Sequence, residues 1–135
     1  MRNSKEKGDI ALAHAIGYYM ANGFEVCVPL GDKRPYDLVV EKKRKLMRVQ
    51  VKYAGRYGRY DRCYAGLRIT GGNKSVNTVK KYSSKSFELL YVLTARGTAY
   101  NIPWNEVEAR SELSVESPKY YKYRVGWGSE VVKRT

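Results

Sequence analysis

Histidine and cysteine are scarce in this chain of 135 residues, which contains one histidine and two cysteines. Zinc centres and Ser-His-Asp triads depend on these residues, so a single His14 excludes several classes of enzyme. We expect His14 on the surface of a helix or at the edge of the core. Cys27 and Cys63 form neither a metal-binding spacing nor a disulfide framework. Cys27 lies in an apolar stretch, where a reduced structural thiol is expected, and this favours a cytoplasmic protein.

Acidic residues are half as frequent as basic ones. The chain has 13 Asp and Glu against 26 Lys and Arg, which gives a net charge of +13. Such an excess destabilises a compact chain by self-repulsion and is typical of a protein with a polyanionic partner. Nucleic acid is the partner that we expect. No stretch approaches the ~20 apolar residues that a membrane span requires, so no membrane partner is expected.

The chain reads as one continuous domain over residues 1–135, without internal repeats or a linker. This length suffices for one modest hydrophobic core. From about Pro118 the sequence becomes a basic tail rich in tyrosine, with Trp127, Lys133 and Arg134 near its end. A basic arm and a strand that packs against the body are both compatible with this composition.

A helix is predicted from about Lys7 to Asn22, because apolar residues recur there at helical spacing and Gly23 supplies a C-terminal stop. We expect the following residues to face a sheet: Ile10, Ala13, Ile16, Gly17, Met20 and Ala21. Three strands are predicted next, near residues 24–30, 36–40 and 46–52.

Short strands, turns and helices are predicted for the rest of the chain. A segment rich in glycine and arginine, residues 54–61, is expected to interrupt the strand pattern. Beyond it we predict a strand at 64–70, a turn at 71–73, a short helix at 75–81, a hairpin of 87–94 with 98–102, and a final helix from Pro103 to about Glu112. The fold class is therefore α/β, a central mixed β-sheet flanked by helices.

Two of these strands bring three polar side chains together. The strands at 36–40 and 46–52 are joined by a short charged turn and so form a hairpin. Side chains alternate along a strand, which places Gln50 and Lys52 on the same side. Across the hairpin both can meet the carboxylate of Asp37. An acid, an amide and an ammonium then share one edge of the sheet.

These three groups suit phosphoryl chemistry with a hard cation. Mg²⁺ binds oxygens of one or two carboxylates and completes its shell with water and substrate phosphate. A lysine beside the ion can orient a nucleophilic water or neutralise phosphoryl charge. Carboxylate, amide and carbonyl oxygens favour Mg²⁺ or Mn²⁺ over zinc.

Pro35-Tyr36-Asp37 followed by Gln50-Val51-Lys52 resembles the PD-(D/E)XK nuclease superfamily, although most members carry Asp or Glu where this chain has Gln50. The resemblance begins at Lys7-Gly8-Asp9 and extends to Tyr53. It is closest to the branch of intron-encoded homing endonucleases with a Q-x-K motif. The order of elements is also similar to archaeal Holliday-junction resolvases. The resemblance implies a restriction-endonuclease-like core.

The resemblance also implies roles for individual residues. The implied catalytic residues are Asp37, Gln50 and Lys52, and the implied ligands of Mg²⁺, for which Mn²⁺ substitutes, are Asp37, the carbonyl of Val51 and Asp9. Lys52 would position the attacking water, and Gln50 would orient water or complete the metal shell. The glutamate that the family carries on its helix corresponds to Leu12, a departure that weighs against activity. Asp9 lies one turn earlier on the same face and is the candidate replacement.

The implied function is a metal-dependent endonuclease that hydrolyses phosphodiester bonds in duplex DNA, site-specific in the manner of a homing or restriction enzyme. Two alternatives stay open. One is a structure-specific Holliday-junction resolvase, and the other is a catalytically disabled DNA-binding protein with the nuclease fold, which Leu12 favours. Symmetric cutting of both strands takes paired active sites, so a homo-oligomer, either a dimer or a tetramer, is implied.

Arginine and tyrosine are interleaved in the segment that follows Lys52. Guanidinium groups bind phosphates, while tyrosines stack on bases or donate to the nucleic-acid backbone. The residues expected to bind DNA are Arg56, Tyr57, Arg59, Tyr60, Arg62, Arg68 and Lys74. The competing interpretation is a solvated loop whose tyrosines partly pack on the sheet.

Overall fold

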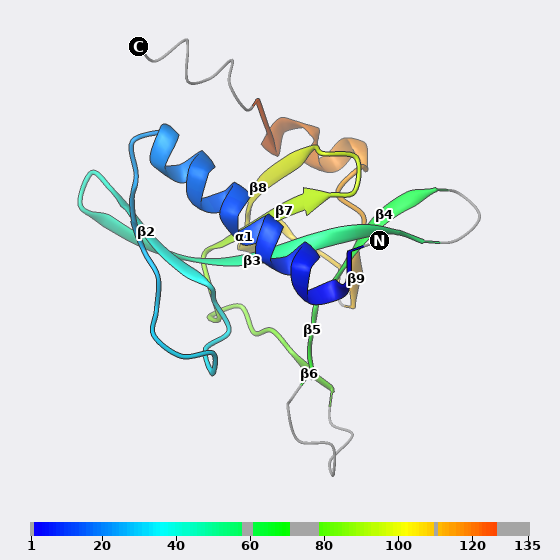
Figure 1. Ribbon diagram of the computed structural model, residues 1–135, viewed down its shortest axis with the longest axis horizontal. Coiled ribbons are helices and arrows are strands. Elements are labelled where there is room, and N and C mark those ends of the chain that lie inside the picture. The colour runs from blue at the N-terminus through cyan, green and yellow to red at the C-terminus, as the bar shows by residue number, and fades with distance from the viewer. Residues whose placement is uncertain (1, 58–60, 71–78, 110, 127–135) are drawn as a thin grey trace.

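The computed structural model describes residues 2–57, 61–70, 79–109 and 111–126. These residues form an N-terminal helix, an eight-stranded sheet and a separate two-stranded sheet (Figure 1). The helices are α1 (Ser4–Ala21) and two short 3-10 helices, η1 (Trp104–Glu106) and η2 (Pro118–Tyr123). The strands are β1 (Glu25–Cys27), β2 (Leu38–Lys42), β3 (Lys45–Tyr57), β4 (Arg62–Gly66), β5 (Arg68–Thr70), β6 (Val79–Lys81), β7 (Leu89–Thr94), β8 (Ala99–Pro103), β9 (Glu112–Leu113) and β10 (Arg124–Val125).

The larger sheet is mixed. Its strand order is β1-β2-β3-β7-β8-β10, with β4 attached to β3 and β9 attached to β4. The pairing of β3 with β7 is parallel, and the other pairings of the described strands are antiparallel. A parallel pair needs a long crossover, which here contains β4, β5 and β6. The predicted α/β class with a central mixed sheet is confirmed.

The ends of α1 follow from its capping residues. The side chain of Asn3 accepts a hydrogen bond from the backbone N–H of Glu6 at 2.9 Å, so the helix begins three residues before the predicted start. After Ala21 the chain passes through Asn22 to Gly23, whose φ of 85° is in the left-handed region that favours glycine. The predicted stop at Gly23 is confirmed.

The face that α1 turns toward the sheet agrees only in part with the prediction: Ile10 and Ile16 pack against the core under α1 as expected, whereas Ala13, Met20 and Ala21 are exposed. Its buried residues are Ala11, Ala15 and Tyr19, spaced four apart, whereas Met20 is 63% exposed. The two alanines allow a close approach to the sheet, and the Tyr19 hydroxyl donates to Asn101 Oδ1 at 2.7 Å. The spacing of apolar residues therefore predicted a buried face that is rotated by about one residue from the observed face. The reason is that two small alanines and a hydrogen-bonded tyrosine make this contact.

Three predicted elements are wrong. Residues 54–61 do not interrupt the strands, since β3 continues to Tyr57 and pairs there with β4. The end of the helix predicted at 75–81 is strand β6, paired with β5, and the turn predicted at 71–73 lies outside the described residues. Of the final helix predicted up to Glu112, only the short 3-10 helix η1 is observed, and Glu112 is the first residue of β9. In each case strand pairing overrides a local preference.

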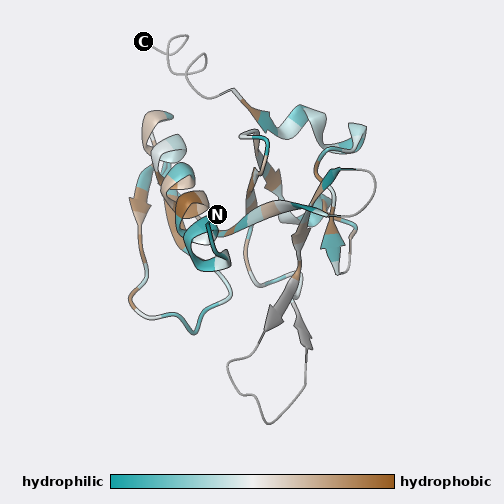
Figure 2. Ribbon diagram, turned by 45° about the vertical axis from the view of Figure 1, so that its right-hand side comes forward, coloured by the Kyte–Doolittle hydropathy of each residue, from teal (hydrophilic) through white to brown (hydrophobic). Residues whose placement is uncertain are grey.

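Two hydrophobic cores cover the two faces of the sheet. The first lies between α1 and the sheet and includes Leu38, Val40, Val49 and Val51. The second lies on the opposite face and includes the residues Ala54, Cys63, Leu67, Phe87, Leu90, Val92, Ile102, Leu113 and Val115. Figure 2 shows apolar residues in the strands of the sheet and in the middle of α1, whereas the first turn of α1 and most of η2 are hydrophilic.

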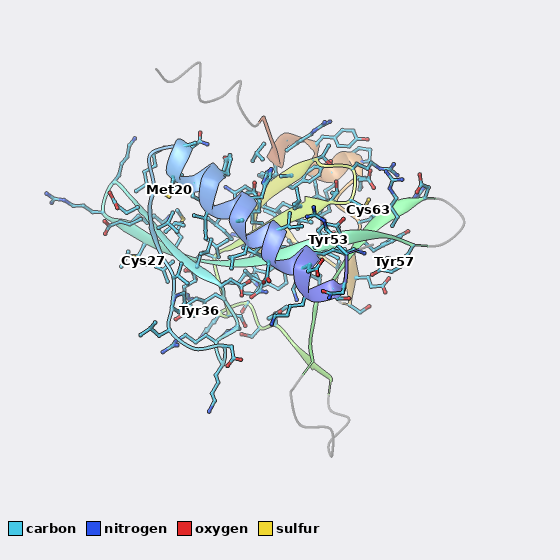
Figure 3. The ribbon with its side chains drawn as sticks, in the orientation of Figure 1. Met20, Cys27, Tyr36, Tyr53, Tyr57 and Cys63 are labelled. Atoms are coloured by element: carbon cyan, nitrogen blue, oxygen red, sulfur yellow. The ribbon has the colours of Figure 1, made fainter. Side chains whose placement is uncertain are left out.

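Several smaller expectations are also settled. His14 lies at the core edge as predicted, with its Nδ1 2.7 Å from the Tyr91 hydroxyl. Cys27 is free, as the predicted reduced thiol requires, but it is exposed on the edge strand β1 and so takes no part in the core (Figure 3). In the tail, β10 pairs with β8, which supports the packed strand, while Trp127, Lys133 and Arg134 lie outside the described residues. Among the described residues, no helix has the length and apolarity of a membrane span.

Candidate active site

Asp37 is held against β3 by two backbone contacts. Its N–H donates to the carbonyl of Val49 at 2.8 Å, and its Oδ2 accepts from the N–H of Val51 at 2.9 Å. Leu38, the first residue of β2, pairs with Val49, so Asp37 lies opposite Gln50. The hairpin predicted from the sequence therefore brings the Asp37 carboxylate beside Gln50 and Val51 of β3.

The environment of Asp37 is partly buried, and burial raises the pKa of its carboxyl group. The hydrogen bond from Val51 and the positive charge of Lys52 act in the opposite direction and limit that rise. A carboxylate in such a place is poorly solvated, which favours a bound cation or a donor beside it.

Gln50 and Lys52 lie on the face of the sheet that α1 does not cover. Val49 and Val51 belong to the core under α1, so the residues that alternate with them face the other way. Gln50 is only 8% exposed, and its Nε2 donates to the Val51 carbonyl at 3.3 Å. The backbone of Val51 thus contacts the Asp37 carboxylate through its N–H and the Gln50 amide through its carbonyl.

Lys52 has a neighbour that the sequence did not reveal. Its Nζ lies over the ring of Tyr82, 5.1 Å from the ring centroid. Tyr82 follows β6 and is distant from β3 in the sequence. No motif spacing marks this tyrosine, since only the crossover from β3 to β7 brings it to the site.

Asp9 is placed differently from the other predicted ligands. It is exposed on α1, the helix that packs on the face opposite Gln50 and Lys52. Leu12 is partly buried and packs against the core under α1. Among the described residues, no group of three or more His, Cys, Asp and Glu side chains could hold a metal ion. Asp37 therefore supplies the carboxylate of this site with carbonyl and amide groups around it.

A comparison with protein families decides the assignment. The model of the PD-(D/E)XK endonuclease family matches residues 2–130. The chain belongs to the PD-(D/E)XK endonuclease family. The resemblance seen in the sequence is thereby confirmed, and the three predicted catalytic residues of this endonuclease lie together around Val51.

The fold of this PD-(D/E)XK endonuclease is also found in a solved structure. A bacterial homing endonuclease, I-Ssp6803I, is similar with 26% sequence identity and a TM-score of 0.81, over 98% of this chain and 96% of that one. None of the curated proteins compared with the chain matches it. The restriction-endonuclease-like core and the similarity to a homing endonuclease are confirmed.

The predicted DNA-binding residues of the endonuclease lie partly on a projecting hairpin. Residues 55–57 of β3 pair with residues 62–64 of β4, and we call this the β3–β4 ribbon (Figure 1). Arg56, Tyr57 and Arg62 are exposed on it, and the ring of Tyr57 lies over Gly55. Arg68 lies in β5, a strand of the second projecting sheet. Arg59, Tyr60 and Lys74 lie outside the described residues.

An ionic cluster beside the ribbon was also missed from the sequence. Arg96, in the turn between β7 and β8, binds Glu116 through its Nε at 2.6 Å and donates to the backbone carbonyl of Asp61. Glu116 in turn accepts from the N–H of Cys63 at 2.9 Å, and Asp61 lies 3.7 Å from Arg56. We call Arg96, Glu116 and Asp61 the ribbon clamp. It ties the ribbon to two other parts of the chain.

Proposed function

We propose that this endonuclease hydrolyses phosphodiester bonds of duplex DNA at specific sequences and depends on a divalent metal ion, Mg²⁺ or its substitute Mn²⁺. The observation that carries the proposal is the arrangement of Asp37, Gln50 and Lys52 around Val51 on one face of the sheet. Site specificity is supported by the similarity to a homing endonuclease.

The donor set fits a hard divalent cation. Asp37 and the carbonyl of Val51 would hold it, Gln50 would complete the oxygen shell, and Asp9 stays a proposed additional ligand. A bound Mg²⁺ supplies Lewis-acid activation and charge neutralisation at the phosphate. Lys52 contributes an ammonium on the same side of the sheet, where it can orient water or neutralise phosphoryl charge.

DNA binding is assigned to the basic projecting elements. The β3–β4 ribbon presents Arg56, Tyr57 and Arg62, and a two-stranded ribbon has the width that the major groove admits. Arg59, Tyr60, Arg68 and Lys74 belong to the same proposal. The net charge of +13 supports a strong sequence-independent attraction to duplex phosphates. A homo-oligomer would pair the active sites for cutting both strands.

A cleavage experiment tests the function and its substrate. The protein is incubated with a random-sequence duplex library and with a four-way junction, under Mg²⁺ and under Mn²⁺. We expect selected duplexes to be cut, the junction to be spared, and Lys52→Ala to lose cleavage. Lys45→Ala, which removes the same charge from the far end of β3, should keep it. Equal cleavage by wild type and Lys52→Ala, or none by either, would refute the proposal.

A second candidate is a DNA-binding protein with a disabled site. Leu12 favours it, because the helix provides an apolar side chain where the family resemblance places a glutamate. Salt-sensitive DNA binding without metal-dependent cleavage would select this candidate. Cleavage of the junction alone would instead select a structure-specific resolvase.

A further inference from the structure

The Lys52 side chain meets an aromatic ring rather than an acid. A lysine side chain is long and flexible, so its strand position alone does not fix the ammonium. Among the described residues, no carboxylate forms an ion pair with Lys52. The Nζ lies 5.1 Å from the centroid of the Tyr82 ring, within the roughly 6 Å at which an aromatic face attracts a cation.

The ring of Tyr82 is itself held by two aromatic neighbours. It meets Phe87 edge-to-face at a centroid distance of 5.1 Å and an angle of 75°, and it meets Trp104 at 6.2 Å and 89°. Phe87 and Trp104 also contact each other, at 4.6 Å, and Phe87 is 1% exposed. Edge-to-face contacts of this kind orient rings as well as burying them.

The backbone beside Tyr82 is fixed as well. The indole Nε1 of Trp104 donates to the carbonyl of Ser83 at 2.9 Å, and the N–H of Ser83 donates to Ser86 Oγ at 2.9 Å. The N–H of Trp104 donates to the carbonyl of Glu88 at 2.9 Å. The segment between β6 and β7 is thus attached to η1, and at Glu88, whose N–H donates to the carbonyl of Arg48 at 3.0 Å, it is also attached to β3.

We infer that Tyr82 is a positioning residue, which holds the Lys52 ammonium on the side of the sheet where Asp37 and Gln50 lie. The inference rests on the proposed function, in which Lys52 is catalytic. The electron-rich face of the ring attracts the ammonium and limits the positions of its stem. The ring, rather than the tyrosine hydroxyl, provides this contact, so Tyr82→Phe retains it and Tyr82→Leu removes it.

Nuclear magnetic resonance of the free protein tests the contact without DNA or metal. A ring shields the protons above its face, so the ε-methylene protons of Lys52 should resonate upfield of those of other lysines. We expect the upfield shift in wild type and Tyr82→Phe and its loss in Tyr82→Leu. Tyr121→Leu, which removes a tyrosine that is 58% exposed, is the matched control and should leave the shift unchanged. An unchanged shift in a folded Tyr82→Leu would overturn the inference.

Cleavage kinetics test the consequence, on a duplex recovered from the library. Tyr82→Leu should lower the single-turnover rate roughly 3- to 30-fold, the range that a cation–π contact supports, with DNA affinity unchanged. Tyr82→Phe should restore the rate. Equal rate losses in Tyr82→Leu and Tyr82→Phe would exclude the ring face as the cause and overturn the inference. Absence of cleavage by wild type would refute the proposed function and leave the resonance experiment to decide the contact.

Discussion

At the scale of single residues, Gln50 places a neutral amide where most members of the family are expected to carry a carboxylate. We predict weak binding of Mg²⁺ to the free protein, because Asp37 supplies the negative charge and the scissile phosphate must add more. Gln50→Glu should tighten metal binding, measured by calorimetric titration. The new carboxylate would be nearly buried beside Asp37, so it should also lower the melting temperature without metal.

Two results would contradict this account of Gln50. One is tight binding of Mg²⁺ to the wild-type protein in the absence of DNA. The other is unchanged metal affinity in Gln50→Glu. Asp37→Asn is the matched control, since it removes one charge at the same site and should weaken binding.

His14 gives the protein a specific pH dependence. Burial lowers the pKa of its imidazole below the ordinary 6.5. The unfolded state therefore takes up the proton first as pH falls, so this contribution to stability is complete above about pH 6.5 and is lost below it. Between pH 7 and 5 the unfolding free energy of wild type should fall more than that of His14→Gln. The difference should stay below about 1.4 kcal/mol per pH unit, because a single imidazole takes up one proton.

Chemical denaturation at several pH values measures that difference. Groups other than His14 titrate equally in both proteins and cancel in the comparison. Parallel pH profiles of wild type and His14→Gln would contradict the prediction.

The proposed catalytic residues could be predicted together because their proximity is local. Asp37, Gln50 and Lys52 lie in one hairpin, whose alternation and register can be deduced from the residues on either side of a short turn. Tyr82 and Arg96 were not predictable in this way. Each is brought to its position by the crossover or by packing in the second core. These contacts join residues far apart in the sequence, so a short sequence window does not reveal them.

At the scale of elements, the ribbon clamp should control the order of β4. Arg96→Met removes the contacts to Glu116 and Asp61, so the backbone amides of β4 should exchange hydrogen faster, while those of β2 should not change. Lys119→Met is the control, because it removes a 2.6 Å ion pair with Glu108 outside the clamp. Equal exchange of the β4 amides in Arg96→Met and wild type would contradict this role.

The elements also show where sequence patterns mislead. Gly55 suggested a break, but it pairs with Tyr64 inside a continuous strand. A short helix was predicted at 75–81, yet residues 79–81 add a strand beside β5. The end of α1 and the β7–β8 hairpin were predicted correctly because a helix cap and a glycine turn are encoded locally, at Gly23 and Gly97.

At the scale of the whole molecule, the net charge of +13 should make DNA binding steeply dependent on salt. Each arginine that binds a phosphate releases counterions, so Arg59→Ala or Arg62→Ala should flatten the slope of log affinity against log salt by roughly one unit. If either arginine instead reads a guanine edge, its loss should cost about 1–3 kcal/mol and relax one base position.

Titration of duplex DNA at several salt concentrations separates these outcomes. Lys45→Ala removes one charge at the opposite end of β3 and serves as the control. Unchanged affinity and unchanged slope in Arg59→Ala and Arg62→Ala would mean that these arginines are solvated and do not bind DNA.

One strand, β3, carries two of the proposed catalytic residues, Gln50 and Lys52, and also the start of the β3–β4 ribbon. A strand rises about 3.3 Å per residue, so the path from Lys52 to Tyr57 is about 17 Å long. Duplex DNA rises about 3.4 Å per base pair, and the same length therefore spans about five base pairs. Because β3 is hydrogen-bonded to its neighbouring strands, this length is fixed. Descendants of this enzyme could therefore exchange side chains on the ribbon and acquire a new target, while the offset between target and cut would be inherited unchanged.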